Sequence, residues 1–343
     1  MNLLSISFPK LGWEFDISRE VFTIGNFSVY WYGVLIALGF ILALVYGLKS
    51  ARMFGLHPDR VVDVVIVGLI GGIIGARAYY VAFSWEDFAD NWVSVFYIHE
   101  GGLAIYGGII GAIGAAAIFC KIKKIRFRPL LDLAAVGFPI GQCIGRWGNF
   151  INQEAFGSET DLPWGMVLSD AAYLNVEGVT AGTPVHPCFF YESVWCALGV
   201  LLLILYRKHR KFDGELFLMY IGWYGLGRAV IEGFRTDSLW LGDIRVSQLL
   251  AALCVVAAVI VIAFIRINIR NMNDPEYMKL YALTEESQIA LGLIPDPNAA
   301  EAAEEPAADA EDAAEVIPEE NEEETVSEEP AEEIPAEEEK TEE

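Results

Sequence analysis

The chain has 343 residues, of which 54% are hydrophobic, and its formal net charge at pH 7 is −24. So large an apolar share excludes an ordinary soluble domain and favours a membrane protein. The acidic balance gives no reason to expect a nucleic-acid partner, because nucleic acids bind basic surfaces.

The negative charge is concentrated at the C-terminus. Residues 296–343 contain 22 Asp and Glu residues against one Lys, so they carry −21 and leave only −3 for the rest of the chain. This segment is rich in Ala and Pro and has few large apolar residues, so it cannot bury enough surface to offset the entropy of ordering. We expect a disordered acidic tail there.

Seven stretches of the remaining sequence are apolar enough, or nearly so, to form membrane helices, which need about 20 residues each. The fourth is the shortest and contains Pro139. The expected fold class is therefore an all-α polytopic membrane protein with seven transmembrane helices. The stretches are residues 27–48, 61–83, 102–120, 130–144, 188–206, 214–231 and 246–267.

Lysine and arginine are unevenly divided between the connecting loops. They cluster after the first, third, fifth and seventh stretches, whereas the loop after the second and the long segment 147–187 have none. Because basic loops stay in the cytoplasm, the N-terminus is expected outside and the C-terminus inside.

This orientation predicts the domain organisation. The expected parts are an extracytoplasmic N-terminal segment (1–26), a membrane domain (27–270) with a small extracytoplasmic head (147–187), a cytoplasmic connector (271–295) and the acidic tail (296–343). The head is expected to consist of loops and short elements without a core of its own.

Polar side chains within the predicted helices mark candidate functional sites, because burying them in a bilayer costs free energy. They lie on the outer side, apart from Asp63 and Asp132, which we expect to be ion-paired near the basic loops. This one-sidedness argues against a transport path and favours an extracytoplasmic site. The outer-side candidates are Tyr32, Arg77, Tyr106, Arg146, Asn149, Glu154, His186, Glu192, Arg228 and Glu232.

The arginines among these candidates indicate the ligand chemistry. Arg77, Arg146 and Arg228 are expected at one depth, and arginine forks bind phosphate bidentately, so a lipid phosphate is the expected anion. The alternative for any one of them is a structural ion pair or a side chain that reaches to the interface. The four histidines are split between the two sides, so no metal site is expected.

One run of residues is far more specific than these patterns. Residues 145–157, Gly-Arg-Trp-Gly-Asn-Phe-Ile-Asn-Gln-Glu-Ala-Phe-Gly, resemble the signature of the prolipoprotein diacylglyceryl transferase family. Shorter matches occur in the expected order over residues 1–270. They are residues 31–33, 101–108, 186–187 with 191–192, and 227–235.

The resemblance implies an activity. Members of this family act in the bacterial cytoplasmic membrane and move the diacylglyceryl group of phosphatidylglycerol onto the lipobox cysteine of a preprolipoprotein signal peptide. A thioether forms and glycerol phosphate leaves. The implied partners are therefore phosphatidylglycerol, preprolipoproteins and membrane lipids, and no metal or organic cofactor is implied.

The resemblance also assigns roles to the central residues. Arg146 and Arg228 are expected to grip the phosphate and to stabilise charge as glycerol phosphate departs. Asn149 is expected to donate a hydrogen bond to the headgroup, and Tyr32 matches a tyrosine held to be essential in the family. Glu154 is expected to orient the arginines.

Further residues complete the expected site. Glu232 also orients the arginines, and Gly157 allows a tight backbone at the head. Arg77, His186 and Glu192 are expected among the substrate-binding residues.

Tyr106 departs from the family pattern, because many members carry there a histidine that has been proposed as the general base. A tyrosine, with a pKa of about 10, is a poor base near neutrality. Tyr106 is therefore expected to act as a phenolate or a hydrogen-bond donor, or else the base lies elsewhere.

Two other functions of the whole chain stay open: a transporter or flippase for an anionic lipid or solute, and a non-catalytic scaffold that binds headgroups.

Overall fold

The computed structural model of the chain describes residues 3–25, 27–89, 91–98, 101–174, 176, 178–236, 240–241 and 244–296. Met1–Ile294 form one compact unit. The predicted acidic tail, apart from its first residue, lies outside the described residues.

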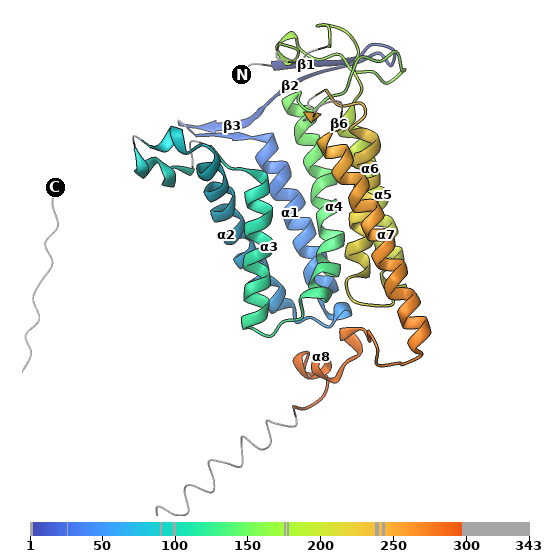
Figure 1. Cartoon of the computed structure of the whole chain (residues 1–343). Helices are drawn as coiled ribbons and strands as arrows, with labels where there is room; N and C mark the ends of the chain where they lie inside the picture. Colours follow the sequence, from blue (N-terminus) through green and yellow to red (C-terminus); the bar gives the residue numbers. More distant parts are fainter. Residues whose placement is uncertain are drawn as a thin grey trace, which may run out of the picture. The chain divides into compact units, whose positions relative to one another are not determined.

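Helices dominate the described part of this unit, and each of the seven predicted stretches overlaps a long helix (Figure 1). Five of them, α1, α2, α3, α5 and α7, are long and apolar enough to cross a membrane, so the chain is a polytopic membrane protein. The helices are α1 (Trp31–Ser50), α2 (Pro58–Phe83), α3 (Ile105–Ile122), α4 (Phe127–Asn152), α5 (Cys188–Tyr206), α6 (Glu215–Ile231), α7 (Val246–Met272) and the short α8 (Glu285–Ala290).

The fourth helix is longer than the sequence predicted. α4 has 26 residues and passes through the buried Pro139 without ending there. It continues to Asn152, so the predicted end of this stretch at residue 144 is wrong, and Arg146 and Asn149 both lie inside the helix. Proline is tolerated inside a membrane helix when neighbouring helices and local adjustments compensate for the lost hydrogen bond.

The expectation of an all-α fold is also wrong in detail, because three two-stranded antiparallel sheets accompany the helices. Strand β1 (Leu3–Phe8) pairs with β2 (Trp13–Ser18) in a register that places Leu3 opposite Ser18 and Phe8 opposite Trp13. The others pair β3 (Glu20–Ile24) with β4 (Phe27–Tyr30) and β5 (Trp240–Leu241) with β6 (Ile244–Arg245).

The N-terminal hairpin packs on the segment between α4 and α5. Ser7 and Val167 exchange both backbone hydrogen bonds, and the side chain of Gln153 donates to Ser5 O over 3.0 Å. The segment, expected to have no core of its own, shares one with the hairpin and with the start of α5. Its core consists of Ile6, Phe156, Met166, Leu168, Tyr173, Val185 and Phe189. We call the end of the helices that carries this core the head end, and the opposite end, where α8 lies, the α8 end (Figure 1).

Close packing of glycines joins α2 to α3. A Cβ atom added at Gly71, Gly75 or Gly111 would collide with the backbone of the facing helix. The two backbones approach each other because glycine has no side chain there. The remaining long helices pack as neighbouring pairs, α1 on α4, α4 on α5, α5 on α6 and α6 on α7.

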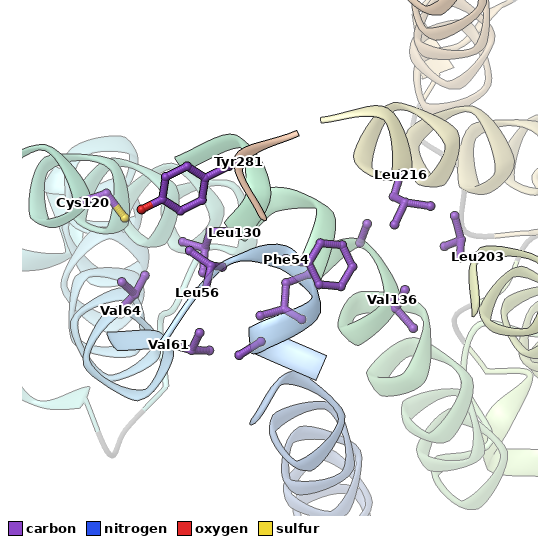
Figure 2. Close-up of a cluster of buried hydrophobic side chains, with 13 residues drawn as sticks. Phe54, Leu56, Val61, Val64, Cys120, Leu130, Val136, Leu203, Leu216 and Tyr281 are labelled. Carbon is purple, nitrogen blue, oxygen red and sulfur yellow. The ribbon is translucent and has the colours of Figure 1, made fainter. Parts of the chain in front are cut away.

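A second core lies at the α8 end (Figure 2). It gathers Phe54 after α1, Leu130 and Val136 of α4 and Leu216 of α6, and Tyr281 enters it from the segment after α7. We call residues 273–294 the C-terminal clasp, because they contact the turns between three pairs of helices.

Three contacts define the clasp. Ser287 Oγ donates to Gly55 O over 3.1 Å, and Tyr281 N donates to Asp213 Oδ2 over 2.7 Å. Glu286 forms an ion pair with Arg126, with Oε2 at 2.5 Å from Nη2.

Asp132 does not form the expected ion pair within the contacts of the described residues. Its side chain is fully buried and accepts the backbone N–H groups of Gly214 and Phe217 over 2.9 and 3.0 Å. Because those N–H groups begin α6 and have no partner within the helix, Asp132 caps α6 from the neighbouring α4.

Candidate active site

Glu192 is the centre of a group of charged side chains at the head end. It lies in the second turn of α5, is 5% exposed, and contacts three arginines from other parts of the chain. Its Oε2 lies 2.5 Å from Nη2 of Arg146 on α4. Its Oε1 lies 3.4 Å from Nη1 of Arg228 on α6 and 2.8 Å from Nη1 of Arg235.

Glu232 extends this group along α6. It follows Arg228 by one turn, and Arg228 Nη2 lies 2.7 Å from its Oε2. Its backbone oxygen accepts a hydrogen bond from Arg245. We call Arg146, Arg228, Arg235, Glu192 and Glu232 the arginine cluster.

Exposure distinguishes the members of the cluster. The side chains of Arg146 and Arg228 are 19% and 20% exposed, whereas those of Arg235, Glu192 and Glu232 are 8%, 6% and 1% exposed. A ligand can therefore reach the first two arginines, while the carboxylates fix them from behind.

The end of α4 adds neutral polar groups beside Arg146. Asn149 lies three residues on, so it shares a helix face with Arg146, and its Oδ1 is 3.5 Å from Nη1 of that arginine. The amides of Asn149 and Asn152 both donate to Oε1 of Glu154, over 2.9 and 3.4 Å. Glu154 thus holds the asparagines, and through Asn149 it contacts Arg146 only indirectly.

Tyr32 packs against α4 at a glycine. A Cβ atom added at Gly148 would overlap the ring of Tyr32, so the ring packs directly on the α4 backbone between Arg146 and Asn149. The side chain of Tyr32 is 39% exposed.

Gly157 lies where three backbone segments meet. Its N–H donates to His186 O over 3.0 Å, and Ser158 N donates to Phe234 O over 2.7 Å. A Cβ atom at Gly157 would lie 2.7 Å from His186 Cβ and 2.9 Å from Phe234 O, so a larger residue forces the segments apart. Arg235 follows Phe234 directly and reaches Glu192 from this crossing.

His186 lies at the same crossing. Its Nδ1 is 3.2 Å from the hydroxyl of Tyr191, which also accepts a hydrogen bond of 2.7 Å from the indole of Trp164. Burial lowers the pKa of His186 below its usual value, so the ring is neutral near pH 7.

Arg77 is not part of the arginine cluster. Its guanidinium donates only to backbone oxygens of the loop between α2 and α3, within the contacts of the described residues. All three guanidinium nitrogens donate to these oxygens, so few N–H groups of Arg77 remain to bind a phosphate. The acceptors are the carbonyls of Ser94, Val95, Tyr97, Gly101 and Gly102.

Tyr106 is the second residue of α3 and is 60% exposed. Among the described residues, none of the cluster's hydrogen bonds or ion pairs involves it. The structure therefore brings together Arg146, Arg228, Glu192 and Glu232, and places Asn149 next to them, but it leaves Tyr106 apart.

Sequence reasoning gave no role to two arginines of the cluster region. Arg235 stood at the end of the matched residues 227–235 but was not proposed as a site residue, and Arg245 was not considered. Both lie after α6 and before α7, in an outer segment where basic residues are scarce, and this scarcity could have marked them. Neither contact follows from helix periodicity, because both arginines lie outside regular helices.

Two apolar grooves lie between the helices. One, of about 350 Å³, is lined by residues of α1, α2 and α4, and Gln142 is its only polar lining side chain. A second, of about 470 Å³, lies between α2, α3 and α4. Such surfaces suit hydrocarbon chains. Within the described residues, no group of three or more His, Cys, Asp or Glu side chains could hold a metal ion.

Comparison with known proteins identifies the family. The family model described as prolipoprotein diacylglyceryl transferase matches residues 19–264. The chain is 40% identical over 258 residues to the phosphatidylglycerol–prolipoprotein diacylglyceryl transferase of Clostridioides difficile, covering 75% of this chain and 98% of that protein. The enzymes of the same name from Shouchella clausii and Listeria innocua are each 43% identical, over 277 and 256 residues.

Those two alignments cover 79% and 75% of this chain, and 97% and 91% of the relatives. The residues that the family model matches include the whole arginine cluster. The chain belongs to the prolipoprotein diacylglyceryl transferase family.

Proposed function

We propose that this chain transfers the diacylglyceryl group of phosphatidylglycerol to a prolipoprotein, and that the acceptor is the thiol of the lipobox cysteine. The bond between the glycerol carbon of the diacylglyceryl group and the phosphate oxygen breaks, and a bond from this carbon to the cysteine sulfur forms in its place. Glycerol phosphate leaves, and the thiol gives up its proton. The observation that carries the proposal is the pair of partly exposed arginines, Arg146 and Arg228, held together by Glu192.

The arginines act on the leaving group. Each guanidinium has five N–H donors, and the contacts with Glu192 and Glu232 use only some of them, so donors remain for phosphate oxygens. Charge builds up on the phosphate as its bond to the glycerol carbon breaks. Fixed cations stabilise that charge without reorganising during the reaction.

The buried carboxylates position the arginines. Two guanidinium groups repel each other, and Glu192 offsets this repulsion while fixing the direction of each fork. Asn149 is well placed to donate to the headgroup beside Arg146, and Glu154 holds its amide. Tyr32 supports the same turn of α4 through its contact with Gly148.

The attacking sulfur must be a thiolate, and cations near a thiol lower its pKa. The cluster therefore favours ionisation of the lipobox cysteine when its thiol approaches. Tyr106 contributes as a hydrogen-bonding group at the head end of α3. Arg77 contributes indirectly, because it orders the loop that leads into α3.

The topology follows the distribution of basic residues. All seven long helices cross the bacterial cytoplasmic membrane, with the N-terminus and the segment between α4 and α5 outside and the C-terminal clasp in the cytoplasm. The outer head consists of the N-terminal hairpin together with residues 153–187, since these share one core. The apolar grooves hold the acyl chains of the lipid.

A reconstituted assay tests the proposal. The purified chain in lipid nanodiscs is given a lipobox peptide and phosphatidylglycerol, with phosphatidylethanolamine in parallel. We expect thioether-linked diacylglyceryl peptide and glycerol phosphate with phosphatidylglycerol only. Arg146→Lys keeps the charge but loses the fork, so turnover should fall by about a hundredfold or more.

The matched control is Arg52→Lys, which changes an exposed arginine at the α8 end and should leave turnover unaltered. If Arg146→Lys turns over like the unchanged enzyme, the arginine fork has no catalytic part. If no lipidated peptide forms from phosphatidylglycerol, the proposed activity itself fails.

A further inference from the structure

Three side chains of the head form a hydrogen-bonded series that ends on a histidine. Trp164 Nε1 lies 2.7 Å from the hydroxyl oxygen of Tyr191, and that oxygen lies 3.2 Å from Nδ1 of His186. The three residues come from the segment between α4 and α5 and from the first turn of α5. Their order determines where the hydrogens lie.

The indole sets the direction at one end of the series. An indole N–H can only donate, so the oxygen of Tyr191 accepts from Trp164. The hydroxyl of Tyr191 has one hydrogen to donate, Nδ1 of His186 is within hydrogen-bond distance, and we infer that this nitrogen accepts it. In this arrangement Nδ1 accepts, and a neutral imidazole carries its hydrogen on Nε2.

The position of His186 links this series to the arginine cluster. Its backbone pairs with Gly157 and Ser158, and its ring centroid lies 4.8 Å from that of Phe234. Arg235, the next residue, contacts Glu192. If the arginines hold the phosphate, the cysteine that attacks the lipid has to come close to the cluster, and the crossing that carries His186 adjoins the cluster through Arg235.

We propose that His186 is a neutral hydrogen-bond donor that binds a backbone carbonyl of the prolipoprotein through its Nε2–H group, and that it is not the base that deprotonates the thiol. This inference rests on the proposed function. A base needs a free lone pair, and in this series Nδ1 is occupied by Tyr191 while Nε2 carries hydrogen. A carbonyl oxygen is the neutral acceptor that suits such a donor, whereas the phosphate is left to the arginines.

The low pKa that burial gives His186 supports the same reading, because the ring stays uncharged near pH 7. A charged imidazolium would have two N–H donors and could not accept from Tyr191. A neutral ring whose Nδ1 accepts from Tyr191 is the tautomer that carries its hydrogen on Nε2.

Kinetic experiments separate the possible roles. His186→Leu removes the donor, and we expect the KM for the lipobox peptide to rise by about three- to tenfold, as loss of one neutral hydrogen bond allows. The kcat and the KM for phosphatidylglycerol should change by less than about twofold on the same grounds. His186→Gln keeps an N–H near the position of Nε2 and should recover most of the peptide KM.

The matched control is His209→Gln at the α8 end, which should leave all three constants unchanged. A fall in kcat with an unchanged peptide KM would show that His186 takes part in proton transfer, and a raised lipid KM would assign it to the headgroup. Either result overturns the inference. Neither affects the proposed activity, which the Arg146 assay tests separately.

Nitrogen-15 NMR of ring-labelled histidine tests the tautomer without any turnover. The His186 signals are assigned by their loss in His186→Gln, and we expect the pattern of an imidazole with hydrogen on Nε2 near pH 7. Tyr191→Phe removes the donor to Nδ1, so the signals should shift towards a mixture of tautomers. Hydrogen on Nδ1 in the unchanged protein would contradict the inference.

Discussion

Arg146 and Arg228 lie on different helices, α4 and α6, yet they contact the same carboxylate, Glu192 on α5: Arg146 lies 2.5 Å from its Oε2 and Arg228 lies 3.4 Å from its Oε1. A single buried side chain therefore sets the separation of the two arginines that a ligand can reach. Removing one member of a buried ion pair leaves an uncompensated charge, which costs about 3–5 kcal/mol. The geometry of the site depends on Glu192 more than on any contact within one helix.

The first prediction is that Glu192→Gln abolishes most turnover. The amide is isosteric but neutral, so the arginines repel each other and lose their fixed orientation. A misplacement of about 1 Å costs up to about a hundredfold in rate, and we expect a loss of that order in kcat. Peptide lipidation in nanodiscs measures it, with the exposed Glu86→Gln as control. Unaltered kcat in Glu192→Gln would contradict the positioning role.

The second prediction concerns Arg77, which binds loop carbonyls rather than the cluster. Arg77→Lys cannot satisfy several carbonyls at once, and each buried acceptor left without a partner costs about 1–3 kcal/mol. We expect lower thermal stability and faster proteolysis between α2 and α3, with the KM for phosphatidylglycerol unchanged. Thermal unfolding, limited proteolysis and a lipid titration measure these effects. A raised KM for phosphatidylglycerol with normal stability would show instead that Arg77 binds the lipid phosphate.

The third prediction tests the contact between Tyr32 and α4. Gly148→Ala places a methyl group where the ring of Tyr32 lies, so the ring must move away from the turn that carries Arg146. We expect kcat to fall by about tenfold or more, because the displacement reaches the site. Gly114→Ala is the matched control, since a Cβ atom at Gly114 meets nothing within 4 Å. Equal kcat values in the two variants would exclude the contact from catalysis.

The sequence predicted the helices well because membrane helices are long and apolar. It placed the end of α4 too early, since Pro139 and the polar residues that follow resemble a helix end, while packing against α1 and α5 carries the helix to Asn152. The N-terminal strands were missed although Trp13–Ser18 alternates between apolar and polar residues, a pattern that is typical of a strand. The pattern does not show the partners of these strands, which lie in a hairpin and in a distant segment.

The site was predictable in part. The motif indicated Arg146 and Asn149, and the spacing of four residues placed Arg228 beside Glu232. Depth in the membrane grouped Arg77 with these residues, yet depth does not reveal a side chain's partners. Backbone carbonyls leave no trace in a sequence, so the acceptors around Arg77 could not be foreseen. Arg235 lay within the matched residues 227–235, but its contact with Glu192 was not predicted, since the two are 43 residues apart.

The C-terminal clasp lies beyond residues 19–264, the part of the chain that the family model matches. Tyr281 is 9% exposed and packs among buried side chains that follow α1 and belong to α4 (Figure 2). Its backbone N–H binds Asp213, and the next helix brings Ser287 to Gly55. The clasp thereby joins the turns after α1, α3 and α5.

The fourth prediction is that the clasp stabilises the membrane domain without taking part in the reaction. Tyr281→Ala leaves a cavity in the core at the α8 end, and loss of a buried aromatic ring costs about 3–5 kcal/mol. We expect a lower unfolding temperature, with kcat and both KM values unchanged well below that temperature. Leu283→Ala is the control, because Leu283 is 59% exposed and belongs to the same segment. Tyr281→Ala with normal stability but reduced kcat would instead couple the clasp to the site at the head end.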